Sequence, residues 1–411
     1  MITNIVSIDK RTARTFLLQT QHLWSNRAEK SGARESRTRD LIESLECVQL
    51  DPVAAVERNH HLVLHARNGT YQTNDLEQLI GNGSLFEYVA NAACLIPVED
   101  YPIFEPIRNQ YRLALGKQRS ELAPVIAQIK ERLAAEGPLP SRAFRSDRLV
   151  RGYWDNTVAK TKETTLALNV LLDTGEITVA RRVGSERFYS LTEQHIPDSL
   201  RKRADEIEEA EAKMALAEKY MRAYRIFDFE DSRFGWYKTS ASERKQLCSR
   251  FLAANKIVPL HIEGVRREYY ILAEDVATVE SISRDQAPSP KIVRFLPPLD
   301  NLLWRRPRLE DLFSFSYKWE IYFPESKREF GYYAMPILYK DMLIGRMDPR
   351  CLREQKKLVI RRLHLENGVR ISKTLVSSLQ KGLLSFARFH QANDIVVEQS
   401  VPEQLRDHLT F

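Results

Sequence analysis

The feature that most constrains the fold of this chain is an internal repeat near its middle. Residues 171–191, LLDTGEITVARRVGSERFYSL, align with residues 251–272, FLAANKIVPLHIEGVRREYYIL, at an offset of 80 residues. The positions that agree are Leu172 and Leu252, Ile177 and Ile257, Gly184 and Gly264, Arg187 and Arg267, and Tyr189 and Tyr269. In each copy a helix ends, a strand follows, a turn contains glycine, and a second strand ends in aromatic residues. The pattern therefore predicts the same small unit twice.

A helix is also predicted before each hairpin. Residues 161–172 carry a run of apolar positions, and the helix at 240–252 opens with Ser240 and Glu243 in capping-box spacing. Further helices are predicted upstream of both. Helices followed by a two-stranded hairpin form a winged helix, a unit that commonly places one helix in a groove of DNA while the hairpin touches the backbone.

Basic residues gather in both hairpins and at the start of the first copy's helix. They are Lys160, Lys162, Arg181, Arg182, Arg187, Arg266 and Arg267. Such side chains pair with phosphates and give salt-dependent affinity without reading sequence. A solvated charged face is the alternative for any single arginine, and winged helices also bind proteins. Two copies with the same layout favour DNA.

A second motif lies in the apolar stretch 47–65, CVQLDPVAAVERNHHLVLH. Gln49 and Asp51 flank Leu50, so in an extended chain both polar side chains share one face. A carboxylate beside a carboxamide on a rigid apolar support can place and polarise a water molecule, or stabilise a developing positive charge. From the pattern alone a polar turn is favoured, because Asp51 followed by Pro52 is a good turn starter.

Other candidate pocket residues are polar groups in apolar surroundings. Segment 85–104, LFEYVANAACLIPVEDYPIF, contains the isolated polar residues Glu87 and Asn91, which either are satisfied inside the protein, the commoner outcome, or line a pocket. His60 and His61 are adjacent, so on a helix they point about 100° apart and do not easily share a metal ion. We interpret them as a packing residue and a DNA or hydrogen-bond contact.

Composition narrows the class of protein. The 411 residues are 43% apolar and 28% charged, which indicates a folded chain long enough for two to four domains. A net charge of +7 suits a polyanionic partner, although many other proteins share it. The four scattered cysteines, and the lack of any Gly-rich phosphate loop or HExxH, predict no metal and no cofactor. With neither a transmembrane run nor a signal peptide, we expect a cytoplasmic protein away from membranes.

Beyond the polar linker 281–290 the chain changes character. Strand-like segments are VRFLPPLDNLLW, FSFSYKWEIYFP, REFGYYAMPILY, MLIGRMD and KLVIRRLHL, with a hairpin turn expected at Lys340-Asp341. A helix is predicted over about 372–391. We expect a small antiparallel barrel or curled sheet closed by this helix. Its arginines either extend a DNA-contacting surface or are ordinary surface charge: Arg294, Arg305, Arg306, Arg308, Arg361 and Arg362.

Taken in order, these stretches resemble the crosslink-repair DNA glycosylases, the winged-helix family of bacterial alkylpurine and interstrand-crosslink glycosylases. The stretches that carry the resemblance span nearly the whole chain: VQLDPVAAVERNHHLVLHARNGTY, LFEYVANAACLIP, GEITVARRVGSERFYSLTE, FLPPLDNLLWRRPRLEDLFSFSYKWEIYFP and REFGYYAMPILYKDMLIGRMD. The resemblance implies an α+β fold of three tandem winged-helix units in a C shape, followed by a C-terminal β-barrel. The implied boundaries are 1–117 for the first unit with the catalytic motif, 118–203 and 204–282 for the next two, and 290–411 for the barrel with its terminal helix.

The implied activity is hydrolysis of the N-glycosidic bond of N7-alkylguanine, including interstrand crosslinks, by a monofunctional glycosylase in base excision repair. The family motif is Gln–apolar–Gln or Gln–apolar–Asp, and Gln49-Leu50-Asp51 matches the second form. By resemblance, Asp51 would deprotonate the attacking water or stabilise the oxocarbenium ion, and Gln49 would orient the water or the nucleotide. The Gln–apolar–Asp form is associated with repair of simple N7-alkylguanines and mustard crosslinks. Asn91 departs from the family, since many relatives have histidine there.

The implied partner is double-stranded DNA carrying an alkylated guanine or a crosslink, bound by a nucleoid-associated monomer. The lesion pocket is expected to include Asn91, Glu87, His60 and His61, and Arg58 joins the basic residues above as a DNA contact. Two competing hypotheses are a non-catalytic winged-helix DNA-binding or regulatory protein and a scaffold that only recognises lesions. The Gln49–Asp51 pair separates the glycosylase from the DNA-binding protein, because a pure binder has no use for a carboxylate that repels phosphates.

Overall fold

The chain forms two compact units in a computed structural model that describes residues 5–25, 33–155, 160–406 and 409. The larger unit comprises Met1–Gln72, Met221–Phe234 and Lys238–Phe411, and the smaller comprises Thr73–Tyr220 and Gly235–Tyr237. Within the described ranges, no helix is both long and apolar enough to cross a membrane. Helices and strands both contribute throughout, so the predicted α+β class is confirmed.

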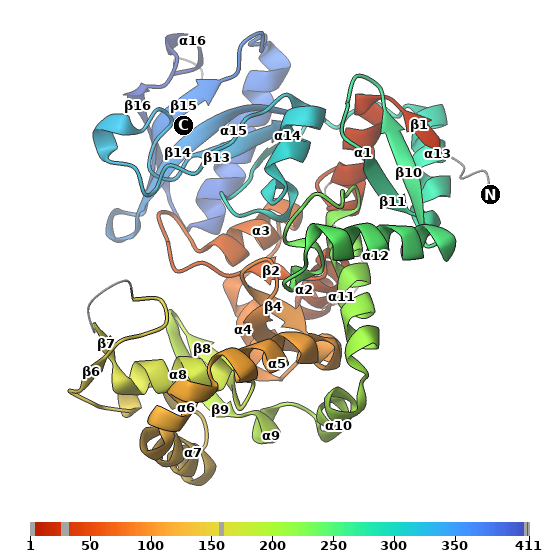
Figure 1. Ribbon diagram of the computed structural model, residues 1–411. Coiled ribbons are helices and arrows are strands. Elements are labelled where there is room, and N and C mark those ends of the chain that lie inside the picture. Colours follow the sequence, from red (N-terminus) through yellow and green to blue (C-terminus); the bar gives the residue numbers. More distant parts are fainter. Residues whose placement is uncertain (1–4, 26–32, 156–159, 407–408, 410–411) are drawn as a thin grey trace. The chain divides into compact units, whose positions relative to one another are not determined.

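The larger unit is built from helices and two sheets (Figure 1). Its elements are β1 (Val6–Ile8), α1 (Lys10–Thr20), α2 (Arg34–Leu45), β2 (Val48–Gln49), α3 (Asn59–Arg67), α12 (Ala241–Ala253), β10 (Ile257–Ile262), β11 (Tyr269–Leu272), α13 (Val276–Asp285), β12 (Val293–Phe295), η5 (Asn301–Leu303), α14 (Arg306–Phe313), β13 (Met335–Tyr339), β14 (Met342–Leu352), β15 (Lys357–Leu365), α15 (Lys373–Phe389), β16 (Asp394–Ser400) and α16 (Glu403–Arg406).

The N-terminal segment of the larger unit joins the second copy of the repeat. Strand β1 pairs in parallel with β10, and β10 pairs antiparallel with β11. Helix α1 begins at Asp9, whose Oδ1 accepts a hydrogen bond of 2.7 Å from the Thr12 amide, and it packs beside α13 (Figure 1). Phe16 and Leu17 of α1 are fully buried in this core. Residues 6–20 therefore fold with residues 257–285, far away in sequence.

The predicted hairpin units are present in both copies of the repeat. Helix α12 begins with the predicted capping box, in which the Ser240 side chain accepts from the Glu243 amide and the Glu243 carboxylate accepts from the Ser240 amide. Hairpin β10–β11 follows it, with Ile257 opposite Leu272. The first copy has the same order of elements in the smaller unit.

The smaller unit consists mainly of helices with short antiparallel ribbons. Its elements are α4 (Thr73–Gly81), β3 (Leu85–Val89), β4 (Ala93–Pro97), η1 (Val98–Phe104), α5 (Glu105–Ala114), α6 (Gly116–Glu121), α7 (Ala123–Glu136), β5 (Leu139–Pro140), β6 (Leu149–Val150), β7 (Thr161–Lys162), α8 (Glu163–Asp173), β8 (Ile177–Val183), β9 (Glu186–Leu191), α9 (Thr192–His195), α10 (Asp198–Glu206) and α11 (Glu209–Tyr224), the last four residues of α11 belonging to the larger unit. Strands β5, β9 and β8 form one sheet, and α7 and α8 bury Leu133, Leu168 and Leu171 against it.

The predicted C-terminal barrel is wrong, because the sheet of this region is open. Its strands lie in the order β12-β13-β14-β15-β16, and within the described chain β12 and β16 are its two edges. Strands β12 to β15 are antiparallel, with the expected turn at Lys340 (φ 58°) between β13 and β14. Strand β16 is parallel to β15, because α15 connects them as a crossover and packs on the sheet (Figure 1).

Two errors in the predicted strands account for the missing closure. Residues 314–334, which the aromatic pattern predicts as strands, form loops, turns and a short 3₁₀ turn. Phe315 and Tyr317 of this segment are buried, with ring centroids 6.2 Å apart. Strand β16 was not predicted. An aromatic at every second position indicates a strand only if the backbone finds a partner strand, and no described strand pairs with this segment.

Gly345 on β14 provides a test of the sheet. A Cβ atom there would lie 2.1 Å from the backbone oxygen of His364 on β15, whereas nothing lies within 4 Å of a Cβ added at Gly69. We expect Gly345→Ala to lower the free energy of unfolding of the larger unit by about 1–3 kcal/mol through overpacking, and Gly69→Ala to leave it nearly unchanged. Urea denaturation of both variants measures this, and equal midpoints would contradict the close strand packing.

Candidate active site

The Gln49-Leu50-Asp51 motif stands on buried backbone. Cys47 and Val48 are fully buried, and the Gln49 side chain is 7% exposed, whereas Asp51 is half-buried at the end of the segment. The Val53 amide donates to Asp51 Oδ1 over 2.9 Å, so the turn expected from Asp51-Pro52 also forms. The turn and the rigid apolar support expected for a site therefore exist together.

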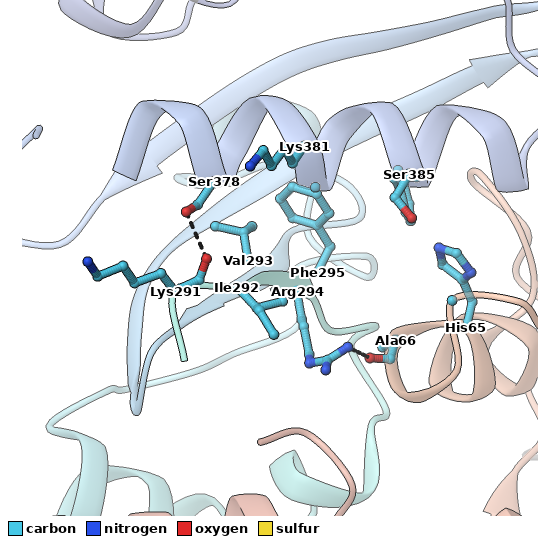
Figure 2. A pocket seen from close by; sticks show the side chains of 13 residues that line it. His65, Ala66, Lys291, Ile292, Val293, Arg294, Phe295, Ser378, Lys381 and Ser385 are labelled. Atoms are coloured by element: carbon cyan, nitrogen blue, oxygen red, sulfur yellow. Dashed lines mark hydrogen bonds between the residues drawn. The ribbon is translucent and has the colours of Figure 1, made fainter. Parts of the chain in front are cut away.

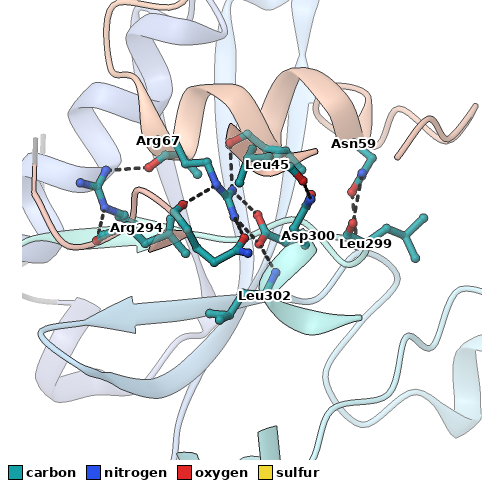
Figure 3. Close-up of polar contacts among 12 residues, drawn as sticks. Leu45, Asn59, Arg67, Arg294, Leu299, Asp300 and Leu302 are labelled. Atoms are coloured by element: carbon teal, nitrogen blue, oxygen red, sulfur yellow. Dashed lines mark hydrogen bonds and ion pairs between the residues drawn. The ribbon is translucent and has the colours of Figure 1, made fainter. Parts of the chain in front are cut away.

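Two carboxamides hold the backbone of this motif (Figure 3). Asn59 Nδ2 donates to the Gln49 carbonyl over 2.9 Å, and the Leu299 amide donates to Asn59 Oδ1 over 3.2 Å. Asn301 Nδ2 donates to the Cys47 carbonyl over 2.8 Å. The backbone is thus fixed on both sides of Val48, and the position of Asp51 follows from it.

A buried ion pair supports the same region (Figure 3). Arg67 and Asp300 are joined by two hydrogen bonds of 2.6 and 2.8 Å, and neither side chain is exposed to solvent. Asp300 Oδ1 also accepts from the Leu302 amide over 2.9 Å. Arg294 donates to the carbonyls of Ala66 and Leu23, so a second buried arginine secures the end of α3.

The sequence reasoning did not single out Asn59, Asn301, Arg67 or Asp300 as site residues. The signal available was a polar residue inside an apolar run, as in NHHLVLHAR and LPPLDNLLW. Buried polar groups must be hydrogen-bonded, so such residues are candidates for holding backbone elsewhere in the chain. The sequence gives no means of telling which carbonyl each one holds.

The electrostatics of Asp51 suit a base. Burial raises the pKa of its carboxyl, and the hydrogen bond from the Val53 amide lowers it in part. Among the described residues no lysine or arginine forms an ion pair with Asp51, whereas nearby Glu57 pairs with Arg353 over 2.9 Å. The pKa of the buried Tyr333 phenol is raised well above its ordinary value, first by burial and then by the charges of Tyr317 and Asp51. Tyr333, which the sequence does not predict as a site residue, therefore interacts electrostatically with the Asp51 carboxylate.

The predicted residues of α3 are mostly interior. His60 and His61 are 3% and 8% exposed, with ring centroids 4.3 Å apart. His61 Nδ1 lies 2.7 Å from the Tyr71 hydroxyl oxygen, within hydrogen-bond distance. Arg58, at the start of α3, is half-buried. Both histidines are buried, so the packing role that we expected for one of them fits both. Their contact with a lesion stays a prediction.

Glu87 and Asn91 belong to the smaller unit. Asn91 lies in the turn between β3 and β4 and is partly buried. Glu87 is 4% exposed and forms ion pairs with Arg182 and Arg187 of the β8–β9 hairpin, the latter at 3.4 Å. The polar group of Glu87 is therefore satisfied inside the protein, which is one of the two expected outcomes. Its partners are two arginines that are predicted to contact DNA.

The other predicted DNA contacts differ in their exposure. Lys160, Lys162 and Arg266 are exposed, and Arg181 is exposed with its guanidinium 3.7 Å from the centroid of the Phe188 ring. Arg267 donates to Asp311 Oδ2 over 3.2 Å. These five, like Arg58, Arg182 and Arg187, stay predictions as DNA contacts.

Several C-terminal arginines suggested as surface charge are structural instead. Arg308 is fully buried and donates to the carbonyls of Tyr224 and Ile226. Arg294 is 8% exposed, and Arg305 pairs with Asp228 over 2.8 Å. Their charge compensates carbonyls and carboxylates inside the protein, so Arg294 and Arg308 cannot extend a surface.

A cavity of about 190 Å³ lies beside the C-terminal part of α3 (Figure 2). Its walls include Lys291, Lys381, Phe295 and Phe386, and the His65 ring is part of the lining. Burial and, to a smaller extent, the nearby Arg294 charge together lower the pKa of His65 to about 4, so the imidazole is neutral near pH 7. Asp51 is not among the lining residues, and this cavity is therefore separate from the motif.

Comparison with known proteins identifies the family of the chain. The family model described as "DNA glycosylase AlkZ-like" matches residues 42–389, which include the whole Gln49–Asp51 segment and the carboxamides that hold it. The chain belongs to the AlkZ-like DNA glycosylase family. It is accordingly an enzyme of DNA repair that binds DNA and hydrolyses N-glycosyl bonds, and the resemblance inferred from the sequence is confirmed.

A solved structure agrees with this membership. The DNA glycosylase AlkZ of Streptomyces sahachiroi matches with a TM-score of 0.64, covering 97% of this chain and 100% of that chain. Sequence identity is 16%, so the match concerns the fold of the glycosylase.

Asn59 tests whether the anchored backbone matters for catalysis. We expect Asn59→Ala to lower single-turnover base release about 10- to 100-fold with little change in DNA affinity, because the Gln49 carbonyl loses its donor and the motif shifts. The exposed Asn74→Ala is the matched control. Unchanged base release in a folded Asn59→Ala protein would contradict the positioning role.

Proposed function

We propose that this glycosylase releases N7-alkylguanine from duplex DNA, including guanines in interstrand crosslinks, by water attack assisted by Asp51 and Gln49. The observation that carries the proposal is the Asp51 carboxylate, which is half-buried, has a raised pKa and forms no ion pair in the described chain. One of its oxygens takes the Val53 amide, and the other is available to a water molecule.

The substrate class follows from the leaving group. A guanine alkylated at N7 is cationic and departs without being protonated, so little acid catalysis is needed. What remains is to stabilise the oxocarbenium ion and place the water, and a partly desolvated carboxylate does both more strongly than one in bulk water. Gln49, with its backbone held by Asn59, orients the water or the nucleotide.

The reaction stops at base release. Residues 47–65 contain no lysine, which suits a monofunctional glycosylase that forms no Schiff base and does not cleave the strand. Crosslinked guanine is included because a base tied to the opposite strand cannot flip fully, as most base-excision enzymes require. A site that acts by one carboxylate and one water makes fewer demands on flipping than a closed pocket.

DNA contact is assigned to tandem winged-helix units. The helix–hairpin order of α8 with β8–β9, and of α12 with β10–β11, supports this interpretation. The exposed candidates Lys160, Lys162, Arg181 and Arg266 pair with phosphates. Because Glu87 orients Arg182 and Arg187, these two arginines present a fixed geometry to the backbone of DNA.

Asp51→Asn is the direct test. The amide keeps the size of the side chain but cannot accept a proton, so base release from duplexes with N7-methylguanine or a nitrogen-mustard crosslink should fall at least about 100-fold. DNA affinity, measured in parallel, should be kept or rise because a negative charge is lost. The exposed Asp40→Asn, on α2, is the matched control. Full activity of Asp51→Asn would refute the assignment, and good DNA binding by the wild type without release of either base would refute the substrate class.

The pH dependence gives a second test. A base must be ionised, so single-turnover release should decline as pH falls through the pKa of Asp51, which lies above the ordinary aspartate value. The decline should follow a single ionisation, and adding salt should not remove it. A rate that is flat throughout the acid range, on DNA that remains bound, would exclude Asp51 as the base.

A further inference from the structure

The smaller unit carries two exposed aromatic rings beside the β6–β7 ribbon. Tyr153 and Trp154 are 43% and 44% exposed, and their ring centroids lie 4.5 Å apart at an angle of 79°. Most large side chains of the protein are buried, so two adjacent aromatics in solvent are unusual. The activity assigned to Asp51 makes no use of them.

The rings are held in place by their surroundings. A Cβ added at Gly152 would lie 2.8 Å from Cε2 of Trp154, so one side of the indole packs on the Gly152 backbone. Asp155 Oδ2 accepts from the Gly152 amide over 2.9 Å and from the Thr161 hydroxyl over 2.8 Å, which ties the segment to β7. The Tyr153 hydroxyl donates to Asp173 at the end of α8. The exposed part of the indole is therefore a fixed surface.

The segment that carries this aromatic pair is rich in basic residues. Residues 142–163 contain six cationic side chains against three carboxylates: Arg142, Arg145, Arg148, Arg151, Lys160 and Lys162 against Asp147, Asp155 and Glu163. Two of the carboxylates have internal roles, since Asp155 holds Gly152 and Glu163 pairs with Arg148 over 3.0 Å. Arg145, Lys160 and Lys162 are all exposed. Residues 142–163 thus carry net positive charge next to two aromatic rings in sequence, and the one carboxylate in the described chain that is bonded to the rings themselves is Asp173, at the Tyr153 hydroxyl.

We propose that Trp154 and Tyr153 stack on an unpaired nucleotide of DNA while the surrounding cations hold its phosphates. Fixed aromatic rings in a basic groove are the combination that binds single strands, because every base has a face to stack on. In an intact duplex the bases are already stacked, so phosphate-binding arginines alone would suffice and an exposed indole would gain nothing. A protein that bound here instead of DNA would need acidic residues opposite the cations and apolar residues opposite the two aromatic rings.

The inference rests on the proposed function and deepens it. A glycosylase with this surface would favour an alkylated guanine near a gap, a single-stranded extension or a strand opened by replication. The stacking surface would add a preference for DNA with unpaired nucleotides to the chemistry assigned to Asp51. An experiment can refute either proposal without refuting the other.

The test compares two DNA substrates with the same N7-methylguanine, one a blunt duplex and one a duplex with a single-stranded extension. We expect the wild type to bind the extended DNA more tightly. Trp154→Leu should weaken binding of the extended DNA about tenfold and leave the blunt duplex unchanged, whereas Trp154→Phe should keep most of the preference because a ring remains. The exposed Leu113→Ala, on α5 of the same unit, is the control for loss of apolar surface.

Two further readouts keep the outcomes distinct. Base release from the blunt duplex should be the same in Trp154→Leu and the wild type, so failure of the wild type to release any base would count against the proposed function alone. Equal loss of affinity on both DNAs, no loss on either, or equal behaviour of the phenylalanine and leucine variants would overturn the stacking proposal. Circular dichroism and the thermal midpoint confirm that each variant is folded.

Discussion

The ion pair between Arg67 and Asp300 is the interaction on which the geometry of the motif depends. Both side chains are fully buried, and removing one partner of such a pair typically costs about 3–5 kcal/mol because the other charge is left uncompensated. Arg67 also donates to the Gln21 carbonyl, and Asp300 accepts from the Leu302 amide. One ion pair therefore fixes the end of α3, the loop after α1 and the start of η5, three segments distant in sequence. The residues on both sides of Asp300 can then meet the chain that carries Gln49 and Asp51.

The anchoring explains how a half-buried carboxylate is tolerated. An ionised group in partly desolvated surroundings raises the energy of the native state, which is what the raised pKa of Asp51 expresses. The hydrogen bonds from Asn59 and Asn301 to the backbone offset this cost without neutralising the carboxylate. An arginine beside Asp51 would stabilise the fold more but would occupy the carboxylate oxygen that the proposed function assigns to the attacking water. Stability is thus supplied through the backbone, and the reactive side chain is left unpaired with any described cation.

The sequence predicted those parts of the fold that depend on local pattern. The repeat placed both hairpins, Ser240 and Glu243 form the capping box, and Lys340 lies in the expected turn. The sequence-based prediction is wrong where a segment becomes a strand only if another segment pairs with it. The aromatic run at 313–324 pairs with no described strand, and the parallel edge strand β16 opens the expected barrel. For the site, Gln49 and Asp51 stay predicted catalytic residues, and the sequence does not indicate the long-range bonds of Asn59 or Arg67, since the identity of a buried polar residue does not indicate which carbonyl it holds.

Charge placement connects the fold to the chemistry. The protein carries a net charge of +7, yet several arginines of the larger unit bind groups within the protein. Arg67 pairs with Asp300, Arg294 donates to backbone carbonyls, and Arg353 pairs with Glu57. Phosphates of bound DNA would raise the pKa of Asp51 further by repulsion, whereas a cationic N7-alkylguanine beside it would lower the pKa. Under the proposed function, the carboxylate therefore gains a favourable partner only where the base is alkylated. Discrimination between damaged and normal guanine can then come from the charge of the lesion itself, with no need for a pocket that reads the shape of the alkyl group.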